Sequence, residues 1–201
     1  MAVTEYETKF KRKKRGLCST WLASQDPTTS EPIPLWFTKG TMKLTKPIPP
    51  SQVPVPVIMI GPGTGVAAFR SFIQYLCSVY PTQKKILVFG CRSETKDYYY
   101  SDEWSTLKES SLSVLTAFSR DNPDGSKTYV QHVIRDQAST LGPMIVQENA
   151  HIYVSGKAKN MPKSVEKAIV DVVKEVLGDE EAAKKYVQEM RKNWRYQQEV
   201  W

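Results

Sequence analysis

The sequence predicts an α/β fold in which a doubly wound parallel sheet occupies residues 54–201 and a proline-rich segment precedes it. After residue 54, short apolar runs typical of buried strands alternate with amphipathic helical patterns. This alternation is typical of a parallel sheet covered by helices on both faces. The chain of 201 residues is 40% hydrophobic and 24% charged, which is enough for a sizeable core and excludes a wholly disordered chain.

Residues 1–53 are expected to be part of a larger domain. A strand is predicted over Val3–Phe10, followed by a basic turn and the segment Gly16–Leu22. Prolines punctuate residues 25–53, and because proline lacks the backbone N–H that a sheet or helix needs, we expect edge strands and loops there. We place a domain boundary between residues 53 and 54.

The first half of the second domain contains three predicted strands. Val55–Ile60 is expected to be buried and to run into the turn Gly61–Gly65, and the next strands are Ile86–Gly90 and Ser113–Phe118. A polar, aromatic-rich helix is expected near residues 101–110. The helix after the turn has apolar side chains at helical spacing, namely Val66, Phe69, Phe72, Ile73, Leu76 and Tyr80.

The second half completes a five-stranded sheet with His151–Val154 and Trp194–Trp201. Helical patterns fill roughly residues 129–149, and Glu180–Lys192 is a further helix.

The helix between these two strands has the clearest end signals. Asn160 can cap it, Pro162 suits its first turn and Gly178 can end it. Its apolar stripe is Val165, Ile169, Val172, Val173 and Val176.

The 28 Lys and Arg residues outnumber the 21 Asp and Glu residues, so the formal net charge is +7. This charge favours anionic partners, and by itself it does not choose among nucleotides, acidic proteins, nucleic acid and anionic membranes. The cysteines Cys18, Cys77 and Cys91 form no metal-binding spacing and fit reduced thiols in a cytoplasmic protein. No secretory signal is expected, and the longest apolar run, Val57–Ile60, is too short to span a bilayer.

Four segments with polar or glycine residues follow predicted strands, and ligands of doubly wound sheets bind at that edge. Gly61–Gly65 allows a pyrophosphate to approach the backbone at a helix N-terminus, although it also suits a plain strand-to-helix turn. Ser119 and Arg120, with Lys127 and Tyr129 further on, suit a dianionic phosphate, although a solvated surface turn is the alternative. The other two segments begin at Cys91 and Ser155.

Three further features leave alternatives open. A terminal tryptophan, Trp201, is either a buried core anchor or an exposed ring that stacks on a flat ligand. The run Lys9–Arg15 has six basic residues in seven, and it suits an acidic partner, a localisation signal, nucleic acid or simply a solvated hairpin turn. No nucleic-acid-binding motif accompanies that run, and His132 and His151 are expected to be structural, so neither nucleic acid nor a metal is predicted.

Several motifs together resemble the NADPH-binding domain of the diflavin reductases, a group similar to ferredoxin–NADP reductase that includes cytochrome P450 reductase and nitric oxide synthase reductase. The motifs are GPGTGVAAFRSF, FGCR, AFSR followed by KTYVQH, IYVSGKAKNMPKSV and the terminal aromatic residue, in the family's order. GLCSTWL resembles the group's FAD-pyrophosphate loop. The details match best with the branch that serves cytosolic iron–sulfur protein assembly.

The resemblance implies cofactor-binding roles for individual residues. The FAD pyrophosphate would contact Gly16, Cys18, Ser19 and Thr20. The NADPH pyrophosphate would contact Gly63 and Thr64, and Arg92 would approach the phosphates. The 2′-phosphate and adenosine would be bound by Ser119, Arg120, Lys127 and Tyr129, with Gln131 beside them.

The resemblance also implies the catalytic residues. Trp201 would stack on the isoalloxazine and move aside for the nicotinamide. Ser155 and Glu199 lie where the group usually places a cysteine and an aspartate near the transferred hydride. Ser155 would hydrogen-bond near the reacting carbon, and Glu199 would stabilise the developing nicotinamide cation.

The implied function is hydride transfer from NADPH to FAD, followed by electron transfer through FMN to an iron–sulfur assembly protein. The implied fold is a ferredoxin–NADP reductase-like NADPH domain preceded by a remnant of an antiparallel FAD-binding β-barrel. The resemblance covers the C-terminal third of a full reductase, without the FMN domain, most of the FAD barrel and its Arg-x-Tyr-Ser motif. The alternative is a truncated NADPH-binding or docking module without turnover of its own.

Overall fold

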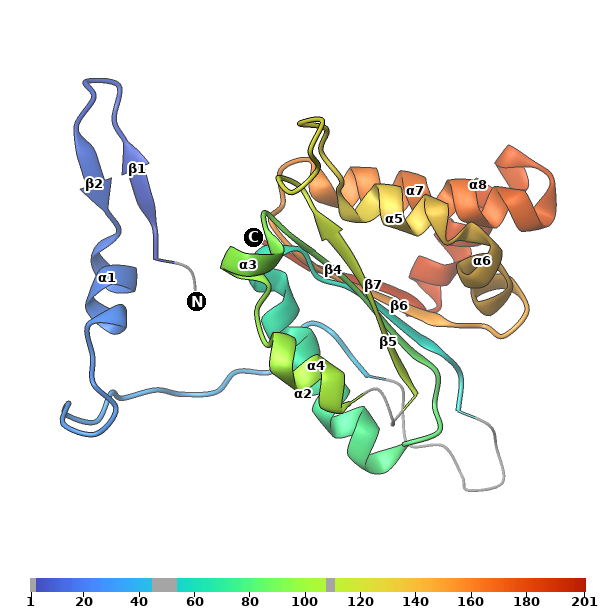
Figure 1. Cartoon of the computed structure of the whole chain (residues 1–201). Helices are drawn as coiled ribbons and strands as arrows, with labels where there is room; N and C mark the ends of the chain where they lie inside the picture. The colour runs from blue at the N-terminus through green and yellow to red at the C-terminus, as the bar shows by residue number, and fades with distance from the viewer. Residues whose placement is uncertain (1–2, 45–53, 108–110) are drawn as a thin grey trace. The chain divides into compact units, whose positions relative to one another are not determined.

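The computed structural model describes residues 3–44, 54–107 and 111–201 (Figure 1). The chain divides into two compact units, Met1–Gly40 and Thr41–Trp201. The predicted boundary at residues 53 and 54 falls at the edge of a stretch outside the described residues, so it stays a prediction.

The first unit is a hairpin followed by a short helix. Strands β1 (Glu5–Glu7) and β2 (Lys13–Arg15) are antiparallel, and the helix α1 spans Leu17–Ala23. The predicted strand Val3–Phe10 is too long, because the chain already turns at Thr8, whose N–H donates to the carbonyl of Arg12 at 3.0 Å. The edge strands expected over residues 25–53 are not found in the part that is described, residues 25–44.

The second unit contains the predicted five-stranded parallel sheet, in the order β5-β4-β3-β6-β7. Its strands are β3 (Val57–Ile60), β4 (Lys85–Cys91), β5 (Leu112–Phe118), β6 (His151–Gly156) and β7 (Tyr196–Val200). The doubly wound fold class is therefore confirmed. The chain moves outward from β3 to β5 and then crosses back to β6 beside β3, so the direction of winding reverses at β3.

Helices cover both faces of this sheet, as Figure 1 shows. One face carries α2 (Val66–Val79) and α4 (Ser101–Thr106), and α3 (Glu94–Asp97) lies between β4 and α4 in the sequence. The other face carries α5 (Val130–Asp136), α6 (Ala138–Val146), α7 (Met161–Leu177) and α8 (Glu180–Lys192). Side chains alternate between two core clusters, because successive strand residues point to opposite faces.

The predicted elements differ from the observed ones mainly at their ends. The pattern over residues 129–149 forms two helices, since Gln137 leaves the helical conformation with φ −101° and ψ 20°. The last strand starts at Tyr196 rather than at Trp194, because Trp194 has a positive φ of 59° that a strand cannot contain. The helix expected near residues 101–110 ends at Thr106, and residues 108–110 lie outside the described part.

The ends of α7 follow the sequence signals in two of three cases. Pro162 lies in the first turn, and Gly178 ends the helix with a left-handed φ of 76°. Asn160 lies at the predicted cap position, but its side chain forms no capping hydrogen bond. Its backbone is already close to helical, with φ −111° and ψ −22°, whereas side-chain capping needs an extended residue.

At the start of β6, the His151 ring is partly buried near the guanidinium of Arg195. The Nη2 of Arg195 donates to the carbonyl of Ile145 at 2.7 Å, which fixes this cation beside the histidine. Burial and the neighbouring positive charge lower the pKa of His151 to about 4.

We expect this histidine to make the protein less stable in acid. The unfolded chain binds a proton at His151 below about pH 6.5, whereas the folded chain does so only near pH 4, so acidification favours unfolding between these values. Between pH 7.5 and pH 5 the wild type should lose about 2 kcal/mol of unfolding free energy more than His151→Gln. Denaturant unfolding at both pH values measures this difference, and equal losses would show that His151 does not titrate as described.

Candidate functional site

The residues predicted from the strand ends lie at one edge of the sheet, because all five strands are parallel. Gly63 and Thr64 follow β3, Arg92 follows β4, and Ser119 and Arg120 follow β5. Ser155 is near the end of β6, and Glu199 and Trp201 are at the end of β7. Open α/β sheets bind ligands at this edge, next to the strand where the winding reverses.

The glycine turn lies between the ends of β3 and β6. Gly65 approaches β6 so closely that a Cβ there would lie 2.0 Å from the carbonyl oxygen of Ser155. Gly63 has a positive φ of 59°, and a Cβ there would meet nothing within 4 Å. The turn is thus packed against β6 on its inner side and open on its outer side, where the N-terminal N–H groups of α2 begin.

Arg92 is held by a buried carboxylate that the sequence analysis missed. Asp97 accepts a hydrogen bond from Arg92 Nε at 2.7 Å and another from the Ser93 N–H at 2.8 Å. Burial acts to raise the pKa of Asp97, but these hydrogen bonds outweigh it and lower that pKa. The Arg92 side chain remains 62% exposed, so its guanidinium is fixed and still accessible to an anion. The signal for this pair in the sequence was an aspartate five residues after the arginine.

The turns after β4 and β5 are joined through their backbones. The N–H of Arg120 donates to the carbonyl of Arg92 at 2.8 Å, and the N–H of Ser119 donates to that of Cys91 at 3.0 Å. The Asp121 carboxylate accepts the Glu94 N–H at 2.7 Å. These bonds bring the backbones of Arg92 and Arg120, which follow neighbouring strands, side by side. Burial raises the pKa of Cys91 to about 12, so this thiol stays neutral and is not a nucleophile.

The loop after Arg120 is shaped by Asn122, a second residue that the sequence analysis missed. Asn122 Nδ2 donates to the hydroxyls of Ser126 and Thr128, both at 2.9 Å, on either side of Lys127. The exposed Lys127 is therefore held on an ordered loop. Asparagine in a loop is a common turn residue, and its two partners become visible only in the structure.

Tyr129 and Gln131 lie at the start of α5. Tyr129 is 42% exposed, and its N–H donates to Nδ1 of His132 at 3.3 Å. The ring centroids of Tyr129 and His132 lie 5.8 Å apart, so the histidine helps to place the tyrosine. Gln131 is partly exposed on the first turn of the helix.

At the other side of the winding reversal, Ser155 and Glu199 are neighbours in the register of β6 and β7. Ser155 is 1% exposed, whereas Glu199 is exposed and accepts a hydrogen bond from the Thr41 hydroxyl at 2.9 Å. Residues opposite each other in a sheet point to the same face, so the structure places these two side chains next to each other.

Trp201 is 60% exposed, so the interpretation as a core anchor is wrong. Two backbone hydrogen bonds fix the main chain of Trp201: its N–H donates to the carbonyl of Gly156 at 3.2 Å, and its main-chain oxygen accepts the Ala158 N–H at 2.7 Å. The main chain of Trp201 is thus fixed beside the end of β6 while the indole remains free to stack on a ligand.

The predicted flavin loop is in the first unit. The N–H of Gly16 donates to the carbonyl of Thr4 at 2.7 Å, and the Ser19 hydroxyl accepts the Thr4 N–H at 3.1 Å. The Ser19 side chain thus already stabilises the loop, and Cys18 is exposed. The Thr20 hydroxyl is buried and has no hydrogen-bond partner among the described residues. An unpaired buried hydroxyl is costly, and a bound phosphate oxygen would satisfy it.

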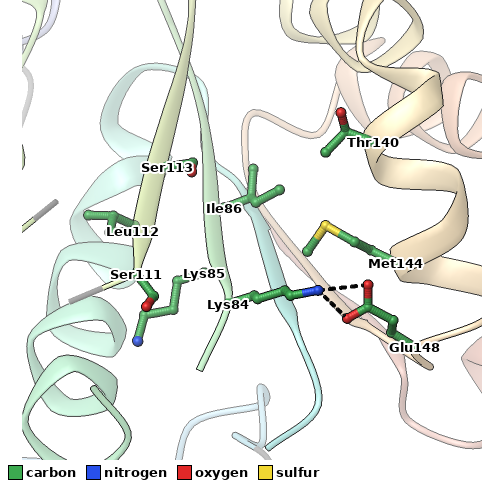
Figure 2. A pocket seen from close by; sticks show the side chains of 9 residues that line it. All are labelled: Lys84, Lys85, Ile86, Ser111, Leu112, Ser113, Thr140, Met144 and Glu148. Carbon is green, nitrogen blue, oxygen red and sulfur yellow. Dashed lines mark hydrogen bonds and ion pairs between the residues drawn. The ribbon is translucent and has the colours of Figure 1, made fainter. Parts of the chain in front are cut away.

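A groove of about 440 Å³ lies at the opposite edge, near the amino ends of β4 and β5 (Figure 2). Its lining residues are Lys84, Lys85, Ile86, Ser111, Leu112, Ser113, Thr140, Met144 and Glu148. Figure 2 shows Lys84 reaching across it to Glu148, and these two side chains form an ion pair at 2.8 Å. None of the predicted site residues lines this groove.

Among the described residues, no group of three or more His, Cys, Asp or Glu side chains could hold a metal ion. No helix in the same part of the chain is long and apolar enough to cross a bilayer.

Comparison with known proteins identifies the family. Along its whole length the chain is similar to NADPH-dependent diflavin oxidoreductase 1 of Danio rerio, with 43% identity, of Xenopus laevis, with 42%, and of Arabidopsis thaliana, with 36%. It covers 33%, 32% and 33% of these proteins, so it spans about a third of their length. Residues 59–167, more than half of the chain, match the oxidoreductase NAD-binding domain. The chain therefore belongs to the oxidoreductase NAD-binding domain family.

Proposed function

We propose that this chain is the NADPH-binding part of a cytoplasmic diflavin reductase that passes hydride from NADPH to FAD. The observation that carries the proposal is the meeting of the open glycine turn with the Arg92 and Arg120 turns at one edge of the sheet. These groups suit the several phosphates of NADPH, because guanidinium groups and helix N-terminal N–H groups both favour anions. The matched family and the name of the relatives support the same ligand.

The proposed binding mode divides the dinucleotide between two parts of the edge. Gly63 and Thr64 receive the pyrophosphate on the open side of the turn, with Arg92 beside them. The 2′-phosphate lies against the ordered loop after β5, where Ser119, Arg120, Lys127 and Tyr129 are found, with Gln131 next to them. Because Arg120 and Lys127 both carry a positive charge, this loop favours NADPH over NADH.

The nicotinamide end is assigned to the other side, at β6 and β7. Ser155 offers a hydroxyl near the reacting carbon, Glu199 offers a negative charge that stabilises a developing nicotinamide cation, and the Trp201 ring covers the flavin until the nicotinamide enters. Gly16, Cys18, Ser19 and Thr20 hold the FAD pyrophosphate. When bound, NADPH and FAD supply the hydride chemistry, so the protein contributes mainly placement and electrostatics.

The same proposal includes an acceptor outside this chain. A second flavin, FMN, would pass the electrons on to an iron–sulfur assembly protein. The word "diflavin" in the name of the relatives supports a second flavin in those proteins. The sequence resemblance supports the iron–sulfur branch.

A second candidate is an NADPH-binding or docking module without turnover of its own. The first unit favours it, because that unit contains only a short hairpin and one helix among its described residues, and Leu17 and Trp21 within the flavin loop are exposed. If this loop cannot fix FAD, the rate of hydride transfer would fall by orders of magnitude, because positioning is the main catalytic contribution.

One experiment separates the two candidates. The protein is incubated with excess FAD, desalted and titrated with NADPH without oxygen, while flavin absorbance is followed. A retained flavin that bleaches identifies a hydride-transfer enzyme. Loss of the flavin together with tight NADPH binding identifies a binding module, and failure to bind NADPH overturns both candidates.

We expect Arg120→Ala to remove most of the preference for NADPH over NADH. A charged hydrogen bond to a phosphate contributes about 1.5–3 kcal/mol, so the ratio of the two dissociation constants should fall about 10- to 100-fold. Calorimetric titration of each nucleotide measures this ratio. Lys185→Ala on α8 is the control, because it removes the same charge outside the proposed site. A variant that still rejects NADH would refute the 2′-phosphate assignment.

We expect Trp201→Ser to ease entry of the nicotinamide. The substitution removes the exposed indole, while the main-chain bonds to Gly156 and Ala158 can remain. NADP⁺ should then bind about 3- to 10-fold more tightly, whereas adenosine 2′,5′-bisphosphate, which lacks the nicotinamide, should bind as before. Calorimetry with the two ligands tests this, and in FAD-loaded protein the rate with NADH should also rise. Unchanged affinities would count against a gating role.

A further inference from the structure

The segment Thr41–Leu44, called the strap below, lies along the α2 face of strands β6 and β7. The N–H of Lys43 donates to Gln197 Oε1 at 2.7 Å, and Gln197 Nε2 donates to the carbonyl of Lys43 at 2.8 Å. The Tyr153 hydroxyl donates to the same carbonyl at 3.0 Å. Met42 and Leu44 pack against the core cluster on this face. The strap is therefore fixed mainly through Lys43 and its two apolar neighbours.

Thr41 meets Glu199 because the strap and β7 run side by side. Gln197 and Glu199 are two residues apart on a strand, so their side chains emerge on the same face. Lys43 and Thr41 are likewise two residues apart, and the Thr41 hydroxyl donates to Glu199 Oε2 at 2.9 Å. The partner of Glu199 on β6 is Ser155. The strap thus reaches the residues assigned to the nicotinamide end.

An exposed glutamate is free to rotate unless something holds it, and fixing such a side chain costs up to about 2 kcal/mol of conformational entropy. Among the described residues, the Thr41 hydroxyl is the hydrogen-bond donor found at the Glu199 carboxylate. A carboxylate that acts on a developing charge must be held in place before the reaction, because preorganised groups need no rearrangement at that moment.

We propose that Thr41 is a positioning residue that holds the Glu199 carboxylate toward the nicotinamide of the bound dinucleotide. This inference rests on the proposed function, because the role of Glu199 belongs to it. The hydroxyl is the required group, so serine can replace threonine and valine cannot. Since Lys43, Met42 and Leu44 fix the strap independently of Thr41, the loss of one hydroxyl leaves the fold intact.

The test compares two ligands that differ in the nicotinamide half. Dissociation constants of NADP⁺ and adenosine 2′,5′-bisphosphate are measured by calorimetry in the Trp201→Ser background, where the indole does not compete with the nicotinamide. Thr41→Val should weaken the binding of NADP⁺ about fivefold, because one hydrogen bond contributes about 1 kcal/mol. The binding of adenosine 2′,5′-bisphosphate should stay unchanged. Thr41→Ser should restore the affinity for NADP⁺. Thr38→Val is the matched control and should change neither constant.

A double-mutant cycle with Glu199→Gln identifies the partner. If Thr41 acts through Glu199, Thr41→Val should have much less effect once the carboxylate is gone. Additive effects, no restoration by serine, or equal weakening of both ligands by Thr41→Val would overturn the inference. If adenosine 2′,5′-bisphosphate does not bind at all, the proposed function itself fails, and this outcome is distinct from the others.

Discussion

The close approach of Gly65 to the carbonyl of Ser155 is the constraint on which the candidate site depends. A Cβ at Gly65 would lie 2.0 Å from that oxygen, so only glycine lets the turn after β3 pack directly against the end of β6. This contact lies where the direction of winding reverses, between the strands that run outward to β5 and those that run outward to β7. The turn is thereby aimed outward, and the loops of both halves meet around it.

On the β5 side, two carboxylates and one amide side chain fix the segments that carry the cations. Asp97 fixes Arg92, Asp121 joins the two arginine-bearing turns, and Asn122 orders the loop that carries Lys127. The Arg92 guanidinium, held in this way, loses little freedom when an anion binds, so more of the charge attraction becomes affinity. The net charge of +7 favours anions in general, whereas these contacts select where on the molecule an anion is held.

The two ends of the proposed dinucleotide site are built differently. The 2′-phosphate side uses residues close together in the sequence, from Ser119 to Gln131, on one loop and the following helix. The nicotinamide side draws Thr41, Ser155, Glu199 and Trp201 from separate segments, joined by the strap and by the main chain of β6 and β7. Placement of the reactive end thus depends on the tertiary structure of the second unit, whereas recognition of the 2′-phosphate is largely local.

The sequence by itself determined the α/β class, the strands and most helices of the second unit, and the glycine turn, because buried strands and amphipathic helices leave periodic patterns and left-handed turns favour glycine. It also indicated the polar residues at the strand ends, since parallel strands bring those ends to one edge. Only the tertiary structure decided that Trp201 is exposed, that Asp97 fixes Arg92, and that Thr41 reaches Glu199, 158 residues away. The periodicity of apolar residues in the sequence does not show which segment crosses which face of a sheet. The burial and the hydrogen-bond partner of a side chain depend on how these segments pack.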